Sequence, residues 1–379
     1  MGALLSAKRP YIVAGGGVHL SGATAPLAEL SRLAAIPVAT TNMGKGAFDE
    51  TLELSAGLVG NCMGRGTIGH HLGELLREAD LILLVGTRTN QNGTDNWTLF
   101  PNAARYIHID IDPLEIGRNY EAERLVGDVK LTLELLCRAV RERDNTMALA
   151  RKAPLSKRIS TGWNALRQDV AAIGGGRSGA IRPEWVMSQL DALLGPRDVV
   201  VADASYATNW ATAYLTAKTE GMRFLSPRGL AGLGWGLPMA LGAKLARPDS
   251  RVFAIVGDGG FGHCWSELET ARRAKLNVIT IVLNNGILGY QAHAENVHYG
   301  DHTDACEFHE VDHAAIARAC GCYAERVADP SEIGPALRRA MDVDGFVLIE
   351  VMTDAAAFPP LSVFEGKSPW TTRHDEAVA

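Results

Sequence analysis

Short apolar runs that alternate with helix-length segments most constrain the fold of this chain. Strands that alternate with helices form parallel sheets covered on both faces, so their residues are apolar throughout instead of apolar at every second position. The pattern predicts an α/β protein with doubly wound parallel sheets. We predict strands at Tyr11–Ala14, Pro37–Thr40, Asp80–Gly86, Asp198–Ala202, Val252–Val256, Val278–Leu283 and Phe346–Val351, and a further strand of alternating pattern at Arg105–Asp110.

A change of composition divides the chain into two parts. Charged residues, glycine and serine accumulate between 144 and 181, as in an interdomain linker. A chain of 379 residues is long enough for two domains, each with its own core. We therefore expect a first domain at 1–145, a linker at 146–181 with one helix around Trp163–Val170, and a second domain at 182–379.

Composition and charge exclude several classes of protein. The chain is 47% hydrophobic and 21% charged, which is typical of a folded globular protein. Its net charge of −6 disfavours nucleic acid and anionic membranes as partners, because both attract a basic surface. The apolar runs are far shorter than a membrane span, the start of the chain is too brief for a signal peptide, and the six cysteines form no Cys-x-x-Cys pair. We expect a cytoplasmic protein.

Two successive strands end in residues suited to a metal and a phosphate. Val252–Val256 runs into Gly257-Asp258-Gly259-Gly260, and Val278–Leu283 runs into Asn284-Asn285. In a right-handed βαβ unit both strands deliver their carboxyl ends to the same edge of the sheet, where ligands bind. A carboxylate and an amide oxygen suit Mg²⁺, and glycines let backbone N–H groups surround an anion. The pattern predicts a metal–diphosphate site.

These two motifs together resemble a known signature. Gly257-Asp258-Gly259, followed after some thirty residues by Asn284-Asn285, is similar to the diphosphate-binding signature of the thiamine-diphosphate enzymes, in particular the acetolactate synthase and pyruvate decarboxylase group. Nearly the whole chain takes part in the resemblance, which is strongest to the large subunit of acetolactate synthase. Further stretches that resemble this group are Ile109–Pro113, Asp203–Trp210, Gly232–Pro238 and Glu267-Leu268.

The resemblance implies ligands for the metal and contacts to the two rings of the cofactor. Mg²⁺ would be held by the side chains of Asp258 and Asn285 and by the carbonyl oxygen of Ile287. Leu233 would wedge between the rings and bend the cofactor, and the carbonyl of Ala231 would accept a hydrogen bond from its amino group.

The diphosphate contacts follow from the same resemblance. Backbone groups of Gly257, Gly259 and Gly260 would donate to the diphosphate. Ser205 and Tyr206, in the loop after an earlier strand, would approach the terminal phosphate.

A histidine-rich segment follows the second motif, between 290 and 313. We interpret it as a mobile loop over the cofactor, in which His293, Gln291 or Tyr290 handles protons or binds a substrate carboxylate. A zinc site built on His309 and His313 is a weaker alternative, because no third ligand follows at regular spacing.

The resemblance also implies a partner. Enzymes of this group have three α/β domains, and the first holds the aminopyrimidine ring and a glutamate. Because the chain begins where the middle domain begins, we expect a separate pyrimidine-binding subunit of about 160–190 residues, the size of one ordinary domain. The assembly would be a hetero-oligomer built on dimers.

The middle domain of relatives often binds FAD or ADP. Arg88 and Asp110 lie where such contacts would be expected, whereas Arg65 stands where acetolactate synthases usually have a histidine, which disfavours FAD. The glycine run at 15–17 could be a nucleotide-binding turn, but a tight turn between strand and helix explains it better.

We therefore expect a subunit of a thiamine-diphosphate and Mg²⁺-dependent enzyme that forms or cleaves a C–C bond next to the carbonyl of a 2-keto acid. An acetolactate-type carboligase is favoured, with a 2-keto acid decarboxylase or a 2-hydroxyacyl-CoA lyase as alternatives. Two alternatives of other classes are a non-catalytic cofactor-binding or assembly paralogue and a nucleotide-binding oxidoreductase.

Overall fold

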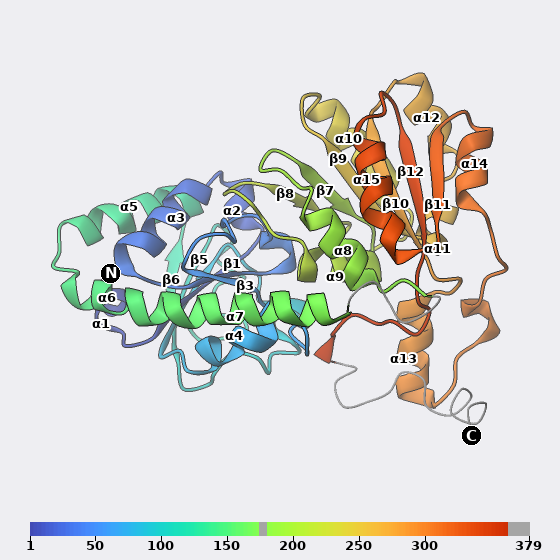
Figure 1. Cartoon of the computed structure of the whole chain (residues 1–379). Coiled ribbons are helices and arrows are strands. Elements are labelled where there is room, and N and C mark those ends of the chain that lie inside the picture. Colours follow the sequence, from blue (N-terminus) through green and yellow to red (C-terminus); the bar gives the residue numbers. More distant parts are fainter. Residues whose placement is uncertain (174–179, 363–379) are drawn as a thin grey trace. The chain divides into compact units, whose positions relative to one another are not determined.

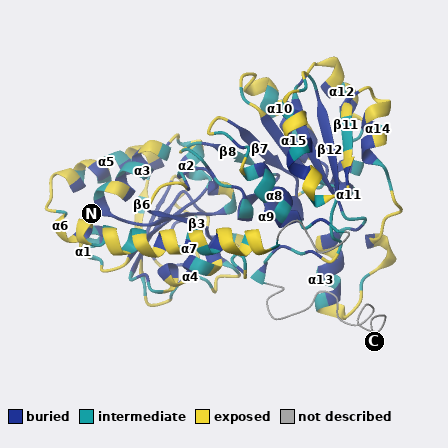
Figure 2. Cartoon of the chain, viewed as in Figure 1, coloured by how far each residue is buried: buried dark blue, intermediate teal, exposed yellow. Residues whose placement is uncertain are grey.

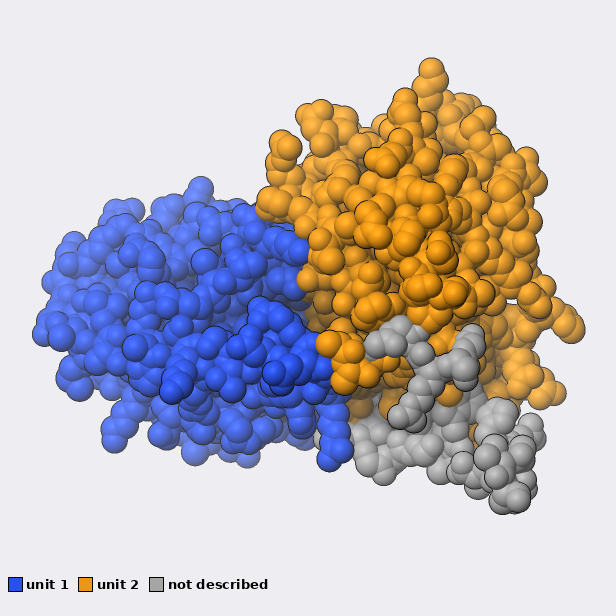
Figure 3. Space-filling model, in the orientation of Figure 1, with its two compact units in different colours: residues 1–169, 216–222 blue, residues 170–215, 223–379 orange. Residues whose placement is uncertain are grey.

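The computed structural model describes residues 1–173 and 180–362. The chain forms two compact units, one of residues 1–169 and 216–222 and the other of residues 170–215 and 223–379 (Figure 3). No helix among the described residues has the length and apolar character needed to cross a lipid bilayer.

Unit 1 contains a six-stranded, wholly parallel sheet in the order β3-β2-β1-β4-β5-β6. Its strands are β1 (Pro10–Ala14), β2 (Val38–Thr40), β3 (Ser55–Leu58), β4 (Leu81–Val85), β5 (Arg105–Asp110) and β6 (Glu123–Val126). Its helices are α1 (Gly2–Ser6), α2 (Gly17–Leu20), α3 (Thr24–Ala34), α4 (Ile68–Arg77), α5 (Val129–Arg141), α6 (Thr146–Ala150) and α7 (Lys152–Ile173). Helices α3 and α5 cover one face, and α4 and α7 lie on the other (Figure 1).

The segment expected to be a linker with one short helix is instead largely helical. Helix α7 runs over Lys152–Ile173 and buries Ile159, Gly162 and Leu166, at helical spacing. A Cβ at Gly162 would touch the Leu72 side chain of α4, so the two helices approach closely there. The buried stripe is narrow among many charged residues, and the composition therefore suggested a linker. The glycine run at 174–179 lies outside the described residues.

Residues 216–222 return from the second half of the sequence to unit 1. The backbone N–H of Glu50 donates to the carbonyl of Ala217, and the N–H of Ala217 donates to Glu50 Oε2 at 2.8 Å. The Glu50 carboxylate also pairs with Lys45 Nζ at 2.6 Å, and both side chains are buried. These polar contacts hold the segment to unit 1, and Ala217 and Met222 within it are buried.

Unit 2 contains a second six-stranded parallel sheet, in the order β11-β12-β10-β9-β7-β8. Its strands are β7 (Val199–Ala202), β8 (Arg223–Leu225), β9 (Val252–Gly257), β10 (Val278–Asn284), β11 (Tyr323–Val327) and β12 (Val347–Met352). Its helices are α8 (Pro183–Asp191), α9 (Tyr206–Tyr214), α10 (Gly236–Ala246), α11 (Asp258–Gly262), α12 (Glu267–Arg273), α13 (Gly289–Tyr299), α14 (His313–Ala319) and α15 (Ile333–Met341).

Helices cover both faces of the second sheet. Alternate strand residues such as Val252, Ala254 and Val256 pack with α10, α12 and α14 in one core. The intervening residues Phe253 and Ile255 face the opposite side, where α8, α9 and α15 lie (Figure 1). The central strands are consequently buried along their length (Figure 2). Two doubly wound parallel sheets confirm the fold class predicted from the sequence.

Candidate cofactor site

The site lies at the carboxyl edge of the second sheet, where the strand order reverses. From β7 the chain goes to β8 on one side, and β9 then lies on the other side of β7. Such a switch point is the usual ligand-binding position of an open α/β sheet. Asp203 follows β7, Asp258 follows β9 and Asn285 follows β10.

Asp258 is buried and directed at the turn after the neighbouring strand. Its Oδ1 accepts from the N–H of Gly259 at 2.8 Å, and its Oδ2 accepts from the N–H of Gly286 at 2.7 Å. Burial raises the pKa of this carboxyl to about 6, although the backbone N–H bonds act in the opposite direction. Among the described residues, no lysine or arginine forms an ion pair with it.

The turn at 284–286 lies beside Asp258 at the carboxyl edge of the sheet. Leu283 is the register partner of Gly257, so β9 and β10 end side by side. Gly286 has a φ of +70°, in the left-handed region that favours glycine, and Asn285 Oδ1 accepts weakly from the N–H of Ile287 at 3.4 Å. The structure thus brings the segments of Asp258 and Asn285 together at one edge. Their role as metal ligands stays a prediction.

Asp203 organises the rest of this edge. Its carboxylate accepts from the N–H groups of Gly234, Trp235 and Gly236 at 2.9, 3.1 and 3.1 Å. Burial raises the pKa of Asp203, and these three bonds oppose the shift. A Cβ at Gly260 would collide with Asp203 Oδ2, so Gly260 is needed for packing whatever it binds. Sequence reasoning missed this role, although an acid directly after a strand and the spaced glycines at 232, 234 and 236 signal it.

Two non-glycine residues near the site have a strained backbone. Ser205 has a φ of 68° and Ala231 a φ of 54°. Such conformations cost on the order of 1–2 kcal/mol and concentrate at binding sites. Ser205 immediately precedes α9, so Tyr206 begins a helix instead of lying in the expected loop. Leu233 is half-buried on the loop that Asp203 holds.

The segment expected to be a mobile loop from residue 290 begins with a helix, which corrects that expectation. Helix α13 runs over Gly289–Tyr299 and ends at Gly300, whose φ is 80°. No glycine or proline interrupts the stretch between them, which allows the helix to form. The loop interpretation rested on the density of histidines, and that density does not prevent a helix.

The three candidate proton-handling residues have different surroundings. His293 is fully buried, and the hydroxyl of Tyr206 contacts its Nδ1 at 2.5 Å. Burial lowers the pKa of His293 to about 4, so it is neutral at pH 7. Gln291 is exposed and donates to Glu295 Oε1 at 2.6 Å, and the exposed ring of Tyr290 packs edge-on against Tyr206. Only Gln291 and Tyr290 reach the surface in this arrangement.

The buried state of His293 predicts how stability depends on pH. Its pKa falls from an ordinary value of 6.5 to about 4 on folding, so the unfolded chain binds a proton that the folded chain does not. This contribution is fully present above about pH 6.5 and is lost as the pH falls towards 4, by about 3 kcal/mol in all. Urea unfolding between pH 4.5 and 7.5 should show a flatter profile for His293→Gln. Parallel profiles would contradict this assignment.

His309 and His313, the pair considered for zinc, do not form a metal site. Within the described ranges, no three His, Cys, Asp or Glu side chains come together as a metal site requires. His313 instead accepts a hydrogen bond from Trp265 Nε1 at 3.2 Å, and His309 is exposed.

The glycine run of unit 1 is explained by backbone packing. The N–H of Gly17 donates to the carbonyl of Gly86 at 2.9 Å, and a Cβ at Gly17 would lie 2.7 Å from the Gly86 Cα. The loops after β1 and β4 therefore pack directly on each other, as in a tight turn. Arg88 is exposed next to this contact.

Comparison with known families identifies the class of protein. Residues 203–351 match the C-terminal TPP-binding domain of thiamine pyrophosphate enzymes, and residues 1–136 match the central domain of the same enzymes. The chain therefore belongs to the thiamine pyrophosphate enzyme family.

Within this family the chain is homologous to acetolactate synthase large subunits. It is 33% identical over 365 residues to the probable acetolactate synthase large subunit of Methanococcus aeolicus, covering 93% of this chain and 59% of that protein. The corresponding protein of Methanocaldococcus jannaschii is 31% identical over 369 residues, with coverage of 94% and 60%. The acetolactate synthase of Mycobacterium bovis is 31% identical over 365 residues, with coverage of 93% and 57%. The chain thus spans less than two thirds of these relatives.

Proposed function

We propose that unit 2 binds thiamine diphosphate with Mg²⁺, held by the side chains of Asp258 and Asn285 and by the carbonyl oxygen of Ile287. The observation that carries this proposal is the convergence of Asp258 on the Gly286 turn, with 2.7 Å between Oδ2 and the backbone N. A buried carboxylate without a cationic partner among the described residues is costly on its own, and a bound cation would offset that cost.

The residues present fit the group. Carboxylate, amide and carbonyl oxygens are hard ligands of the kind that Mg²⁺ takes, with its remaining positions filled by phosphate oxygens and water. A Cβ built at Gly257 or at Gly286 meets no described atom within 4 Å, so these backbones face open space beside the carboxylate. A diphosphate can approach both without a clash.

Each element of this edge has a distinct part in the proposal. The turns after β9 and β10 hold the metal and the diphosphate, with backbone donors from Gly257, Gly259 and Gly260. The loop fixed by Asp203 presents the carbonyl of Ala231 and the side chain of Leu233 to the rings. Ser205 and the first turn of α9 face the terminal phosphate. When bound, the cofactor supplies a carbon that adds to a carbonyl and accepts the electrons released with CO₂.

His293 has a positioning part in the proposal, and Tyr290 and Gln291 are the groups placed to meet substrate. A neutral, buried His293 joins α13 to Tyr206 of α9. Tyr290 lies one turn earlier, at the exposed start of α13, and Gln291 is exposed next to it. An exposed hydroxyl and amide can bind a carboxylate or relay a proton, whereas His293 would first have to leave the core.

We further propose that turnover needs a pyrimidine-binding domain on a separate subunit of about 160–190 residues, the size of one domain. The chain would form a hetero-oligomer based on dimers. The matched models support this, because they are the central and C-terminal domains of the family and the ring-binding part of the site would come from a further domain. The relatives named acetolactate synthase support a carboligase that joins a 2-keto acid to a second carbonyl compound.

A turnover assay tests the proposed function. The chain is purified alone and co-expressed with a candidate pyrimidine-binding subunit, and 2-keto acid consumption, CO₂ and C–C products are measured with thiamine diphosphate and Mg²⁺. We expect all three only when both chains are present. CO₂ without a C–C product would support a decarboxylase instead, and consumption by the chain alone would contradict the need for a partner.

A further inference from the structure

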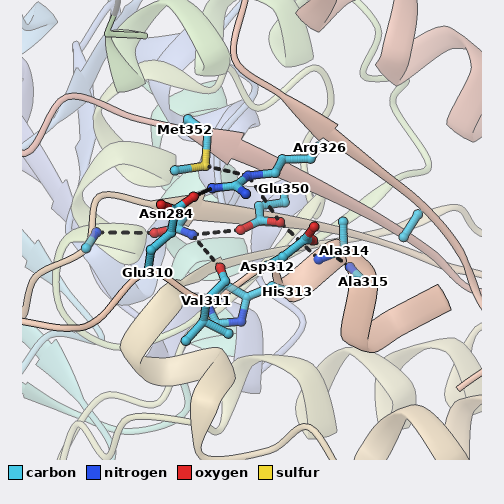
Figure 4. A network of polar contacts seen from close by, with 12 residues as sticks. Asn284, Glu310, Val311, Asp312, His313, Ala314, Ala315, Arg326, Glu350 and Met352 are labelled. Carbon is cyan, nitrogen blue, oxygen red and sulfur yellow. Dashed lines mark hydrogen bonds and ion pairs between the residues drawn. The ribbon is translucent and has the colours of Figure 1, made fainter. Parts of the chain in front are cut away.

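Glu350, on β12, is a charged side chain in the core of unit 2. It is 0% exposed, and its register partners are Val282 on β10 and Arg326 on β11. Its Oε1 accepts from Asn284 Nδ2 at 2.7 Å, and its Oε2 accepts from the N–H of Ala314 at 2.9 Å (Figure 4). Arg326 Nε lies 3.9 Å from Oε2. A buried carboxylate is retained at a cost, so its partners indicate what it serves.

Asn284 connects Glu350 to the site. Its Nδ2 also donates to the carbonyl of Val311 at 3.3 Å, while its Oδ1 accepts from the N–H of Gly286 at 3.2 Å. The same N–H donates to Asp258 Oδ2 at 2.7 Å. A continuous series of hydrogen bonds therefore runs from Glu350 through Asn284 and Gly286 to Asp258.

The orientation of the Asn284 amide decides whether this series holds. With Nδ2 towards Glu350, Oδ1 faces the N–H of Gly286 and accepts from it. In the reversed orientation the amide would present N–H groups to the N–H of Gly286, and two donors would oppose each other. Glu350 and the carbonyl of Val311 are both acceptors, so together they select the first orientation.

A carboxylate is the side chain that suits position 350. Two donors converge on it, the amide of Asn284 and the backbone N–H of Ala314. A carboxylate accepts from both, whereas the amide of glutamine has a single acceptor oxygen. Replacing Glu350 by glutamine therefore sets two donors against each other, at Ala314 or at Asn284, and in either case the Asn284 amide is held less firmly.

We propose that Glu350 is a positioning residue of the cofactor site: it fixes the Asn284 amide and thereby the 284–286 turn that faces Asp258. The consequence for cofactor affinity rests on the proposed function, whereas the consequence for the turn itself does not. Glu350 touches neither cofactor nor substrate in this arrangement, because Asn284 and Gly286 lie between it and Asp258.

The first test is Glu350→Gln. Hydrogen exchange of the Gly286 amide, followed by NMR on the chain without cofactor, should become at least about tenfold faster, because the amide loses one acceptor and its turn is released. Calorimetric titration of thiamine diphosphate with Mg²⁺ should show affinity reduced about 10- to 100-fold, as for other losses of outer-shell support around a metal.

The matched control is Glu310→Gln. Glu310 belongs to the same network through Arg326, at 2.6 Å from Nη2, but its side chain is 76% exposed. It makes no described contact with Asn284, so exchange at Gly286 and cofactor affinity should both stay at the wild-type values.

Exchanging the amide at position 284 with the carboxylate at position 350 should restore the hydrogen bond between them. Glu350 Oε1 and Asn284 Nδ2 are 2.7 Å apart, so Asn284→Asp alone places two carboxylates in contact. Both Gly286 protection and cofactor affinity should fall strongly. In Asn284→Asp/Glu350→Gln, the new carboxylate accepts from the new amide and from the N–H of Gly286. It no longer donates to the carbonyl of Val311, so recovery should be incomplete. The new amide oxygen accepts from Ala314. The double variant should regain Gly286 protection and come within about tenfold of wild-type affinity, a coupling that a merely structural role would not produce.

The outcomes separate this inference from the proposed function. Wild-type Gly286 exchange in folded Glu350→Gln, or a double variant no better than the weaker single one, overturns the positioning role. If Glu350→Gln does not fold, the double variant decides alone: recovery of fold and protection supports the role, and failure overturns it. Altered exchange in a chain whose wild type binds no thiamine diphosphate, either alone or with a pyrimidine-binding subunit, overturns the proposed function and leaves the positioning role supported.

Discussion

Asp258→Ala should abolish the Mg²⁺-dependent binding of thiamine diphosphate, with at least about a 100-fold loss of affinity in calorimetric titration. Removal of outer-shell support already costs 10- to 100-fold in metal sites, and Asp258 supplies the only carboxylate of the proposed ligand set. Asn285 and Ile287, the other two ligands of the set, offer only neutral oxygens in its place. Chelation of Mg²⁺ should have the same effect on the wild-type chain.

His309→Ala is the control for this prediction. His309 is exposed in the same unit, and its removal should leave cofactor affinity unchanged. The unfolding temperature of the cofactor-free Asp258→Ala chain should stay close to wild type. Removal of a buried charge that no described cation balances offsets the loss of its bonds from Gly259 and Gly286, and the Gly286 N–H keeps Asn284 Oδ1 as an acceptor. Equal affinities of Asp258→Ala and the wild-type chain would contradict the metal assignment.

Gly260→Ala should destabilise unit 2 by about 3 kcal/mol, through overpacking and loss of a buried hydrogen-bond network. The new Cβ would collide with Asp203 Oδ2, and that carboxylate holds three backbone N–H groups of the 234–236 loop. Displacing Asp203 leaves those donors without their acceptor in a buried position. Urea unfolding of the cofactor-free chain measures the loss.

Gly257→Ala, in the same motif, should lower cofactor affinity and leave stability nearly unchanged. Gly257 has an extended backbone, with a φ of −80°, and a Cβ there meets no described atom within 4 Å. Stability should stay within about 0.5 kcal/mol of wild type, while affinity for thiamine diphosphate falls because the methyl group enters the proposed diphosphate space. Similar destabilisation by both substitutions would show that the two glycines serve one packing role.

The fold class and the central strands could be predicted from the sequence because a parallel sheet covered on both faces requires continuous apolar strands. The strands that sequence reasoning missed are β3, β6, β8 and β11, and each is an edge of its sheet. An edge strand pairs on one side only, and β6, β8 and β11 are largely polar or half-exposed. Such strands depend on tertiary pairing, which a local pattern does not contain.

Convergence of the Asp258 and Asn285 segments could be predicted because the topology of a βαβ unit alone brings the strand ends together. The role of Glu350 could not, because its partners Asn284 and Ala314 are 66 and 36 positions away in sequence and no local pattern marks them. His293 was predicted to handle protons because of its position after the motif. The sequence did not show that α13 turns this side chain into the core against Tyr206.

In the proposed function, Asp258 and the turn at 284–287 hold a metal-bound diphosphate. Its most direct test is a crystal structure of the chain with thiamine diphosphate and Mn²⁺ in place of Mg²⁺, located by anomalous scattering. We expect one Mn²⁺ peak about 2.1 Å from oxygens of Asp258, Asn285 and Ile287, and in contact with the diphosphate. A metal and diphosphate bound away from Asp258, or no metal with the cofactor in place, would contradict it.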